Sequence, residues 1–381
     1  MTLDYAFSLI HAVQCINRPT KSGMNFKAYL AQFQEFFSSY IIHSLLNVTI
    51  TQSYESYSMH TIDNEIKNDL EKVEEILSTL LSGSAYEANV NAMCQHVVKA
   101  GGKRIRPRLS VLSWRALNSQ TKASDNYERM LKFASATELL HTATLVHDDV
   151  IDKATIRRGV STLNDTEGNH AAVLAGDYLF TRCFFCLHDV SEPKLFALVN
   201  ETLAALVMGE INQLHNQGDL NISIADYEHT IYCKTGALFE LTTSGIAVLE
   251  KAPDSIVEAF KEYGKQLGIA FQVADDILDY SSDTKTLGKS VGEDLEDGRI
   301  TLPLILALKN TQDKKGLQKA IRDCDLEKVL SFIRETDSLD LCRKFAYEAV
   351  EKAMKALEVI EDSPYKEMLI ELAKKAANRT R

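Results

Sequence analysis

From residue 61 onward, apolar side chains recur at intervals of three and four residues through one segment after another. This spacing gathers them on one face of an α-helix, whereas a half-buried strand would need strict alternation. The 381 residues include only 17 glycines and 6 prolines, and few turn-forming residues favour few turns and long helices. We therefore predict an all-α fold, a single large bundle of many helices.

Helix-start signals support this prediction at three places. Thr61 opens the first periodic segment, "SIADYEH" begins another at 223, and Ser363 precedes a proline at a first helical position. Residues 1–60 are different, because they are sparsely charged, aromatic and serine-rich, with no clear period. They lack the pattern of a transit peptide or a secretory signal. We expect 1–60 to be a poorly ordered or atypical extension and 61–381 to form the helical domain.

Charge and cysteine content exclude several classes of protein. The net charge is −11, which argues against nucleic acid as a partner. No run reaches the ~18 apolar residues of a membrane span. The seven cysteines are scattered, which is typical of reduced thiols in the cytoplasm. Cys183 and Cys186 form a C-x-x-C pair, but a redox or metal role fits less well than packing inside one buried helix.

Two apolar segments end in the same acidic pattern, "LLHTATLVHDDVID" and "LGIAFQVADDILD". Positions i and i+4 of a helix share a face and i+1 lies close by, so the carboxylates of each segment are neighbours. Their repulsion and burial would be unfavourable. A bound Mg²⁺, which takes oxygen ligands from carboxylates, water and phosphate, would offset both effects. The candidate metal ligands are Asp148, Asp149, Asp152, Asp275, Asp276 and Asp279.

If these helices face each other across one cavity, the two clusters could hold several Mg²⁺ around a polyphosphate. The alternative is two solvated helix ends with surface acids. That alternative is weaker for two clusters than for one, because each of them belongs to an apolar helix.

Cations that suit a phosphate accompany the acids. "KAGGKRIRPRLS" places Lys103, Arg104, Arg106 and Arg108 after a glycine pair, with Pro107 starting a helix. A glycine turn into a helix N-terminus exposes backbone N–H groups to an anion. Lysine adds a point charge and arginine a fork that matches phosphate oxygens. A solvated basic turn is the alternative.

Further candidates follow along the chain. Arg157 and Arg158 come just after the first acidic cluster, and His141 lies two turns before Asp148 on the same face. His141 is either a ligand contact or a satisfied core residue. "YCKTGALFE" places a lysine inside an apolar helix, where it needs an anionic partner. A later glycine-punctuated loop contributes the charged residues Lys289, Asp294 and Arg299. The acids thus suit metal, and metal plus cations suit diphosphate.

In this order, GGKRIRP, HDDVID with RRG, the KT pair, FQVADDILD and GKSVGED resemble the motifs of trans-polyprenyl diphosphate synthases. The likeness is greatest to the bacterial octaprenyl type, covers about 65–381 and finds no counterpart for 1–60. It implies an all-α bundle around a central cavity, usually as a homodimer. It also implies condensation of isopentenyl diphosphate with an allylic diphosphate, farnesyl or geranyl. A quinone side chain, as in ubiquinone, is the expected use of a product delivered to a membrane.

The resemblance also assigns roles. Asp148 and Asp152 would bind two Mg²⁺ and Asp275 a third. The expected isopentenyl diphosphate site consists of Lys103, Arg106, His141 and Arg158. The residues expected to face the allylic diphosphate or stabilise the carbocation are Arg157, Lys234, Thr235, Gln272 and Lys289. The residues expected to be catalytic are Asp148, Asp152, Asp275, Lys234 and Arg157. Arg299 stands where many relatives have lysine.

Product length should depend on the helix before the first acidic cluster. Ala143 and Thr144 lie one turn back from it and Leu140 two turns back. Small residues here leave a tunnel open, whereas short-chain relatives close it with an aromatic residue. We therefore predict a long product. The competing functions are a terpene cyclase, whose second metal motif differs, and a noncatalytic partner subunit, which would be expected to lose an acidic cluster.

Overall fold

The computed structural model of the chain describes residues 62–119, 126–281 and 292–378. The predictions for residues 1–60 and for Lys289 lie outside these ranges. From Asp63 onward the chain forms one compact unit.

The first half of this unit begins with a helix over 62–80. The elements that follow are η1 (Ala85–Glu87), α3 (Ala88–Lys99), α4 (Ile105–Leu117), α5 (Tyr127–Ile151), β1 (Ile156–Arg157), β2 (Val160–Ser161), α6 (Leu163–Thr166), α7 (Asn169–Val190) and α8 (Pro193–His215). The later elements are α9 (Ile224–Ile231), η2 (Tyr232–Gly236), α10 (Ala237–Leu249), α11 (Asp254–Ser281), α12 (Glu293–Glu296), α13 (Leu302–Asn310), α14 (Lys314–Arg322), α15 (Leu326–Glu335), α16 (Ser338–Ala356), η3 (Leu357–Val359) and α17 (Pro364–Ala377).

The predicted all-α fold is confirmed. Within the described ranges the only sheet is the antiparallel hairpin of β1 and β2. Two predicted helix starts also hold, because Ser223 caps α9 together with Asp226, and the Ser363 side chain accepts a hydrogen bond from the backbone of α17. The helix α4 begins at Ile105, two residues before Pro107, which is still within the first turn that tolerates proline.

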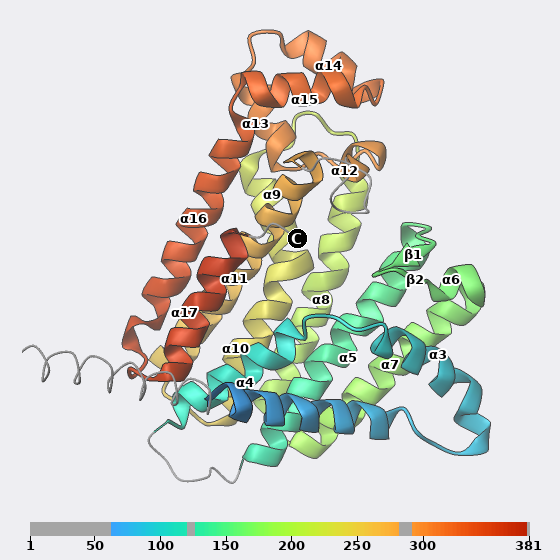
Figure 1. Cartoon of the computed structure of the whole chain (residues 1–381), viewed down its shortest axis with the longest axis vertical. Coiled ribbons are helices and arrows are strands. Elements are labelled where there is room, and N and C mark those ends of the chain that lie inside the picture. Colours follow the sequence, from blue (N-terminus) through green and yellow to red (C-terminus); the bar gives the residue numbers. More distant parts are fainter. Residues whose placement is uncertain (1–61, 120–125, 282–291, 379–381) are drawn as a thin grey trace, which may run out of the picture. The chain divides into compact units, whose positions relative to one another are not determined.

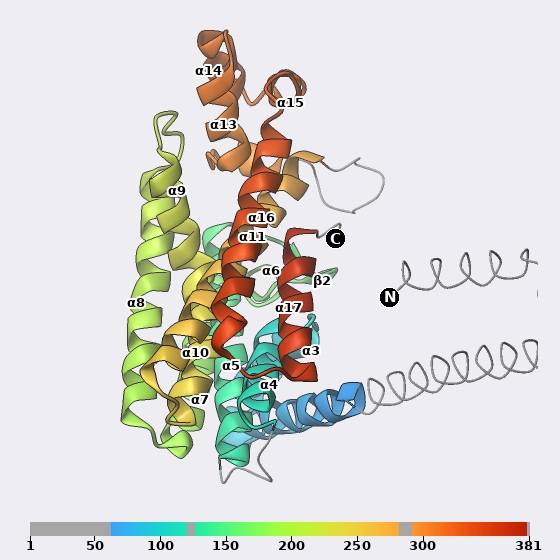
Figure 2. The same ribbon diagram turned by 90° about the vertical axis from the view of Figure 1, so that its left-hand side faces the viewer.

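The bundle brings the two acidic segments together through α10. This helix packs against α11 and also contacts α5, while α7 lies along another side of α5 (Figure 1). On its far side α11 is covered by α16 and α17 (Figure 2). The first acidic motif ends α5 and the second lies near the end of α11.

Between α9 and α10 the helix widens into the π turn η2, which carries Lys234 and Thr235. Neighbouring backbones approach this turn closely from two helices. A Cβ atom on Gly209 of α8 would lie 2.8 Å from the backbone nitrogen of Lys234, and one on Gly268 of α11 would lie 2.6 Å from the Cα of Gly236. Glycine at both positions therefore permits α8 and α11 to close on η2.

An apolar face of α7 and α8 is exposed. The prediction that residues 171–187 form one buried helix is correct for the helix and wrong for its burial, since Leu174 is 65% exposed and Phe185 is 56% exposed. Cys183 and Cys186 do lie on the buried face as free thiols. Of the described helices, α8 alone has the length and apolar composition to cross a membrane, with 22% of that stretch buried. The absence of a membrane span stays a prediction.

Replacing Gly268 by alanine tests the close approach at η2. The new methyl group would collide with the backbone of Gly236, so we expect the free energy of unfolding to fall by ~1–3 kcal/mol. Denaturant titration measures this change. Gly83→Ala is the control, because its new methyl group would meet only the side-chain ends of Glu87 and Asn91. Equal stability of the two variants would contradict the account.

Candidate active site

The first acidic motif ends α5, and its members differ in their contacts. Asp149 is buried and accepts a hydrogen bond from Nε of Arg157 at 2.5 Å. Asp148 is half-buried, and Asp152 caps the helix at the surface. Burial raises the pKa of Asp148 to about 6, opposed by Lys234 and reinforced by Glu210 and Asp152. Within this motif the Asp149 carboxylate therefore pairs with Arg157, whereas a negative charge on Asp148 is unfavourable because that side chain is desolvated.

In the second motif, two carboxylates accept hydrogen bonds from within the chain. Asp276 accepts one from the Tyr227 hydroxyl at 2.6 Å and one from the Gln272 amide at 2.9 Å. Asp279 accepts from the backbone N–H groups of Glu293 and Asp294, at 3.1 and 3.2 Å, where α12 begins. Burial raises the pKa of both carboxyls above the usual range.

Three aspartates that we predicted as metal ligands therefore accept hydrogen bonds of 3.2 Å or less from within the chain. They are Asp149, Asp276 and Asp279. Asp275 is half-buried at the same end of α11.

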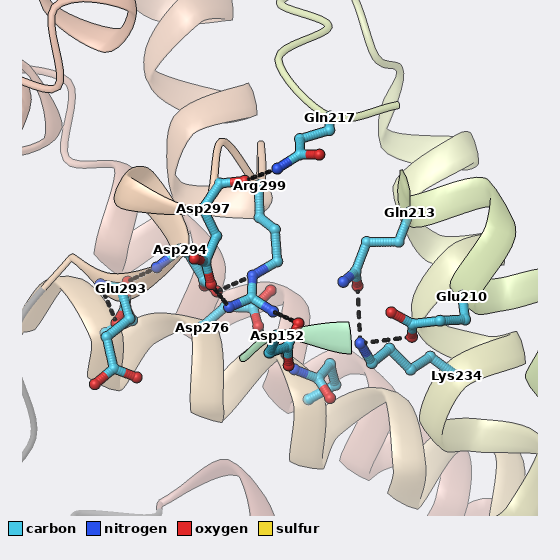
Figure 3. Close-up of polar contacts among 12 residues, drawn as sticks. Asp152, Glu210, Gln213, Gln217, Lys234, Asp276, Glu293, Asp294, Asp297 and Arg299 are labelled. Carbon is cyan, nitrogen blue, oxygen red and sulfur yellow. Dashed lines mark hydrogen bonds and ion pairs between the residues drawn. The ribbon is translucent and has the colours of Figure 1, made fainter. Parts of the chain in front are cut away.

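Arg299 joins the two motifs. Its Nε lies 3.1 Å from Oδ1 of Asp294 and its Nη1 lies 3.9 Å from Oδ1 of Asp152, and it also pairs with Asp297. Figure 3 shows the guanidinium between these carboxylates. Because Asp279 accepts from the backbone of Asp294, a continuous line of contacts runs from the first motif to the second.

Lys234 approaches the same region from η2. Its Nζ lies 2.8 Å from Oε2 of Glu210 and donates to Oε1 of Gln213 at 3.3 Å (Figure 3). The anionic partner expected for a lysine in an apolar helix is thus Glu210. Our sequence analysis missed Glu210 and Gln213, although an acid and an amide three residues apart in the apolar stretch "ALVMGEINQLH" were a visible signal.

Lys234 and Gln213 line a cavity of about 150 Å³. Its charged lining residues are Lys234, Asp276, Asp294 and Arg299, and its amides include Gln213 and Gln272. Thr235 is linked to this wall because its hydroxyl donates to Gln272 at 2.8 Å. Burial raises the pKa of Asp294 to about 7, with Asp279 reinforcing the shift. A cavity with cations on its wall and carboxylates beside them suits a metal-bound anion.

A second group of cations surrounds His141. Nε of Arg106 is buried without a hydrogen-bond partner among the described residues, and its guanidinium lies 4.9 Å from the centroid of the Phe239 ring. Burial lowers the pKa of Arg106 to about 10, with Glu138 opposing the shift and Arg158 adding to it. Burial, Arg106 and Arg158 hold the pKa of His141 well below its usual range. His141 is therefore neutral at pH 7 among these cations, and a group of cations of this kind suits an anion.

The side chain of Arg158 packs against the glycine turn before α4. One Nη of Arg158 donates to the carbonyl of Gly101, and a Cβ atom on Gly102 would lie 2.7 Å from that nitrogen. Lys103 is exposed next to this turn. Arg104 is not available as a phosphate ligand, because its Nε, Nη1 and Nη2 all donate within the chain, to Glu74, to Glu138 and to the carbonyl of Val98.

The residues predicted to control chain length lie on α5. Leu140 and Ala143 are buried, and the half-buried Thr144 donates to the carbonyl of His141 at 2.8 Å. None of the three lines the cavity described above. The tunnel therefore stays a prediction.

The donor set fits Mg²⁺. Within the described ranges no group of three histidine, cysteine or acidic side chains is arranged to hold a metal by itself. Mg²⁺ needs fewer protein ligands, typically one or two carboxylates, and completes its shell with water and phosphate oxygens. Asp148, Asp152 and Asp275 could supply those carboxylates, and a dication would offset the burial of Asp148.

The family model described as "Polyprenyl synthetase" matches residues 87–335. The chain belongs to the polyprenyl synthetase family. The octaprenyl diphosphate synthase of Haemophilus influenzae is 36% identical, over 82% of this chain and 99% of that protein. The geranyl-diphosphate-specific all-trans-nonaprenyl-diphosphate synthase of Rhodobacter capsulatus is 39% identical, over 78% and 91%.

A solved structure agrees with these relatives. The polyprenyl synthase of Caulobacter crescentus, crystallised with calcium and isoprenyl diphosphate, has 33% identity and a TM-score of 0.76, over 84% of this chain and 97% of that one. The family predicted from the motifs is confirmed, and this polyprenyl synthetase is a prenyltransferase enzyme.

Replacing Gly102 by alanine tests the contact between the glycine turn and the Arg158 guanidinium. The methyl group would displace the guanidinium, so we expect KM for isopentenyl diphosphate to rise about tenfold, the loss of one charge-assisted hydrogen bond. Steady-state kinetics measure it. Gly168→Ala is the matched control, because Gly168 also has a positive φ but no atom near its Cβ. A rise in both variants, or in neither, would argue against the predicted role of Arg158.

Proposed function

We propose that this enzyme adds isopentenyl diphosphate units one after another to a farnesyl or geranyl diphosphate, with Mg²⁺, and makes a long trans-polyprenyl diphosphate of the octaprenyl type. One observation carries the proposal. Both acidic motifs are connected through Arg299 beside the cavity that Lys234 lines, and a separate group of cations surrounds His141.

In this proposal the two acidic motifs bind the allylic diphosphate through Mg²⁺. Asp148 and Asp152 hold two Mg²⁺ and Asp275 a third, whereas Asp149, Asp276 and Asp279 position their neighbours. Bound Mg²⁺ would draw charge from the departing diphosphate. Lys234 and Arg157 add fixed positive charge where negative charge develops as the C–O bond breaks. Thr235 and Gln272 lie beside Lys234 and face the allylic end.

Isopentenyl diphosphate binds the cations Lys103, Arg106 and Arg158 and the neighbouring His141. Its double bond attacks the allylic carbocation, and a proton is then lost. No side chain stands out as the base, so we assign the proton to the departing diphosphate. The site must exclude water, because water would quench the carbocation.

The proposed product length follows the relatives, whose names specify octaprenyl and nonaprenyl chains. The small Ala143 one turn before the acidic motif is consistent with a long product. We further propose that the product becomes a quinone side chain after delivery to a membrane. A cytoplasmic enzyme would suit the free thiols, since none of the six cysteines in the described ranges forms a disulfide.

We also propose a homodimer in which a second copy covers the exposed apolar face of α7 and α8. Val207, Ile211 and Leu214 of α8 are each at least half exposed and recur at helical spacing. Light scattering should give twice the chain mass of 42.6 kDa, and Ile211→Glu should give a monomer. A wild-type monomer would contradict the homodimer.

A product assay tests the proposed function. Purified protein is incubated with Mg²⁺, farnesyl diphosphate and labelled isopentenyl diphosphate, and the products are dephosphorylated and separated by chromatography. We expect long linear prenols, and none after chelation of Mg²⁺ with EDTA. Cyclic hydrocarbons would favour a terpene cyclase, and no product would favour a noncatalytic partner subunit.

Ala143→Tyr tests the tunnel in the same assay. A phenol side chain at this position should block the growing chain, so we expect short prenols in place of long ones while turnover continues. Ala143→Ser is a control of nearly wild-type size, and its products should keep the wild-type length. An active Ala143→Tyr enzyme with unchanged product lengths would show that the tunnel lies elsewhere.

A further inference from the structure

We propose that Tyr227 is a positioning residue, which acts through Asp276 to fix both the Gln272 amide and the π turn that carries Lys234. The inference rests on the proposed function, since it concerns the same cavity. Tyr227 lies in the helix-start signal "SIADYEH", but the resemblance assigns it no role in the site.

The four residues form one continuous chain of hydrogen bonds, in which the Asp276 carboxylate accepts from both sides. The Tyr227 hydroxyl donates to Oδ2 of Asp276 at 2.6 Å, and Nε2 of Gln272 donates to Oδ1 of the same carboxylate at 2.9 Å. The Thr235 hydroxyl then donates to Oε1 of Gln272 at 2.8 Å. Tyr227 and Asp276 are each only 3% exposed, so water does not readily replace a missing partner.

This chain determines which way the Gln272 amide faces. The carboxylate offers two acceptors, one used by Tyr227 and the other by Gln272. An ionised carboxylate only accepts hydrogen bonds, so the amide nitrogen points to Asp276 and the amide oxygen to the Thr235 hydroxyl. The Tyr227 hydroxyl contributes by holding the carboxylate in this orientation. Because Gln272 lines the cavity, the orientation of its dipole matters for a developing charge there.

The same chain also braces the π turn η2. Tyr227 precedes the turn on α9, Thr235 belongs to the turn, and both are tied to α11 through Asp276 and Gln272. A π turn is a local departure from regular helical hydrogen bonding and is often found at functional sites. Two ties to α11 would hold the turn in register, and with it Lys234, whose ammonium lies 2.8 Å from the carboxylate of Glu210 (Figure 3).

The simpler alternative is a buried hydrogen bond that contributes to stability alone. The chain offers a matched control on α11, because the buried Tyr263 donates a single hydrogen bond to the carbonyl of Leu369 at 2.8 Å. Tyr263→Phe removes one buried hydroxyl as Tyr227→Phe does, but from a tyrosine that does not line the cavity.

The experiment compares wild type, Tyr227→Phe and Tyr263→Phe in melting temperature, kcat and KM for both substrates. We expect both variants to lose similar stability. Only Tyr227→Phe should lose kcat, by at least about tenfold, because misplaced catalytic groups reduce turnover. KM for isopentenyl diphosphate should stay within about twofold in both variants, since its proposed site lies on α4, α5 and the hairpin.

Asp276→Asn is a second variant, in case Tyr227→Phe does not fold. Asparagine offers one acceptor and one donor, so either the Gln272 amide or the Tyr227 hydroxyl must reverse its hydrogen bond. In both cases the network changes, and kcat should again fall at least about tenfold. The inference is overturned if turnover of Tyr227→Phe, or of Asp276→Asn in its place, matches that of Tyr263→Phe. A wild-type protein that makes no prenols overturns the proposed function, and this inference with it. An active wild type whose Tyr227→Phe variant behaves like the control overturns this inference alone.

Discussion

The repulsion between carboxylates gathered from two helices is the constraint on which the rest of this structure depends. The first motif brings Asp148 and Asp152 to the end of α5, and the second brings Asp275 to the end of α11. Burial raises the pKa of Asp148, so its charge is costly without a compensating cation. Lys234 and Arg157 supply part of that compensation, and we infer that a metal-bound diphosphate supplies the rest.

Backbone geometry makes this arrangement possible. Glycine at 209 and at 268 lets α8 and α11 close on the π turn, so that Lys234 reaches Glu210 and Thr235 reaches Gln272. A regular α-helix in place of the π turn, or larger residues at 209 and 268, would place Lys234 and Thr235 differently. The chemistry of the cavity is therefore a consequence of close helix packing as well as of the charged residues.

The sequence predicted what depends on local spacing. Helical periodicity gave the all-α class, the i, i+4 rule identified the acidic faces, and a lysine in an apolar helix implied an anionic partner. It did not predict which acid would be that partner, because Glu210 and Lys234 meet only through the packing of α8 on η2. For the same reason the spacing alone made all six aspartates candidate metal ligands, although Asp149, Asp276 and Asp279 have internal donors from other segments. Exposure of α7 likewise depends on which neighbours cover it.

Calorimetric titration of inorganic diphosphate in the presence of Mg²⁺ tests the central claim most directly, since it needs neither a prenyl chain nor turnover. It compares wild type, Asp148→Asn, Asp275→Asn and the double variant. If both motifs bind one metal-bound diphosphate, each single substitution should weaken binding strongly. The double variant should then lose much less binding free energy than the sum of the two single losses. Strictly additive losses, or wild-type binding that is equally tight without Mg²⁺, would contradict the account.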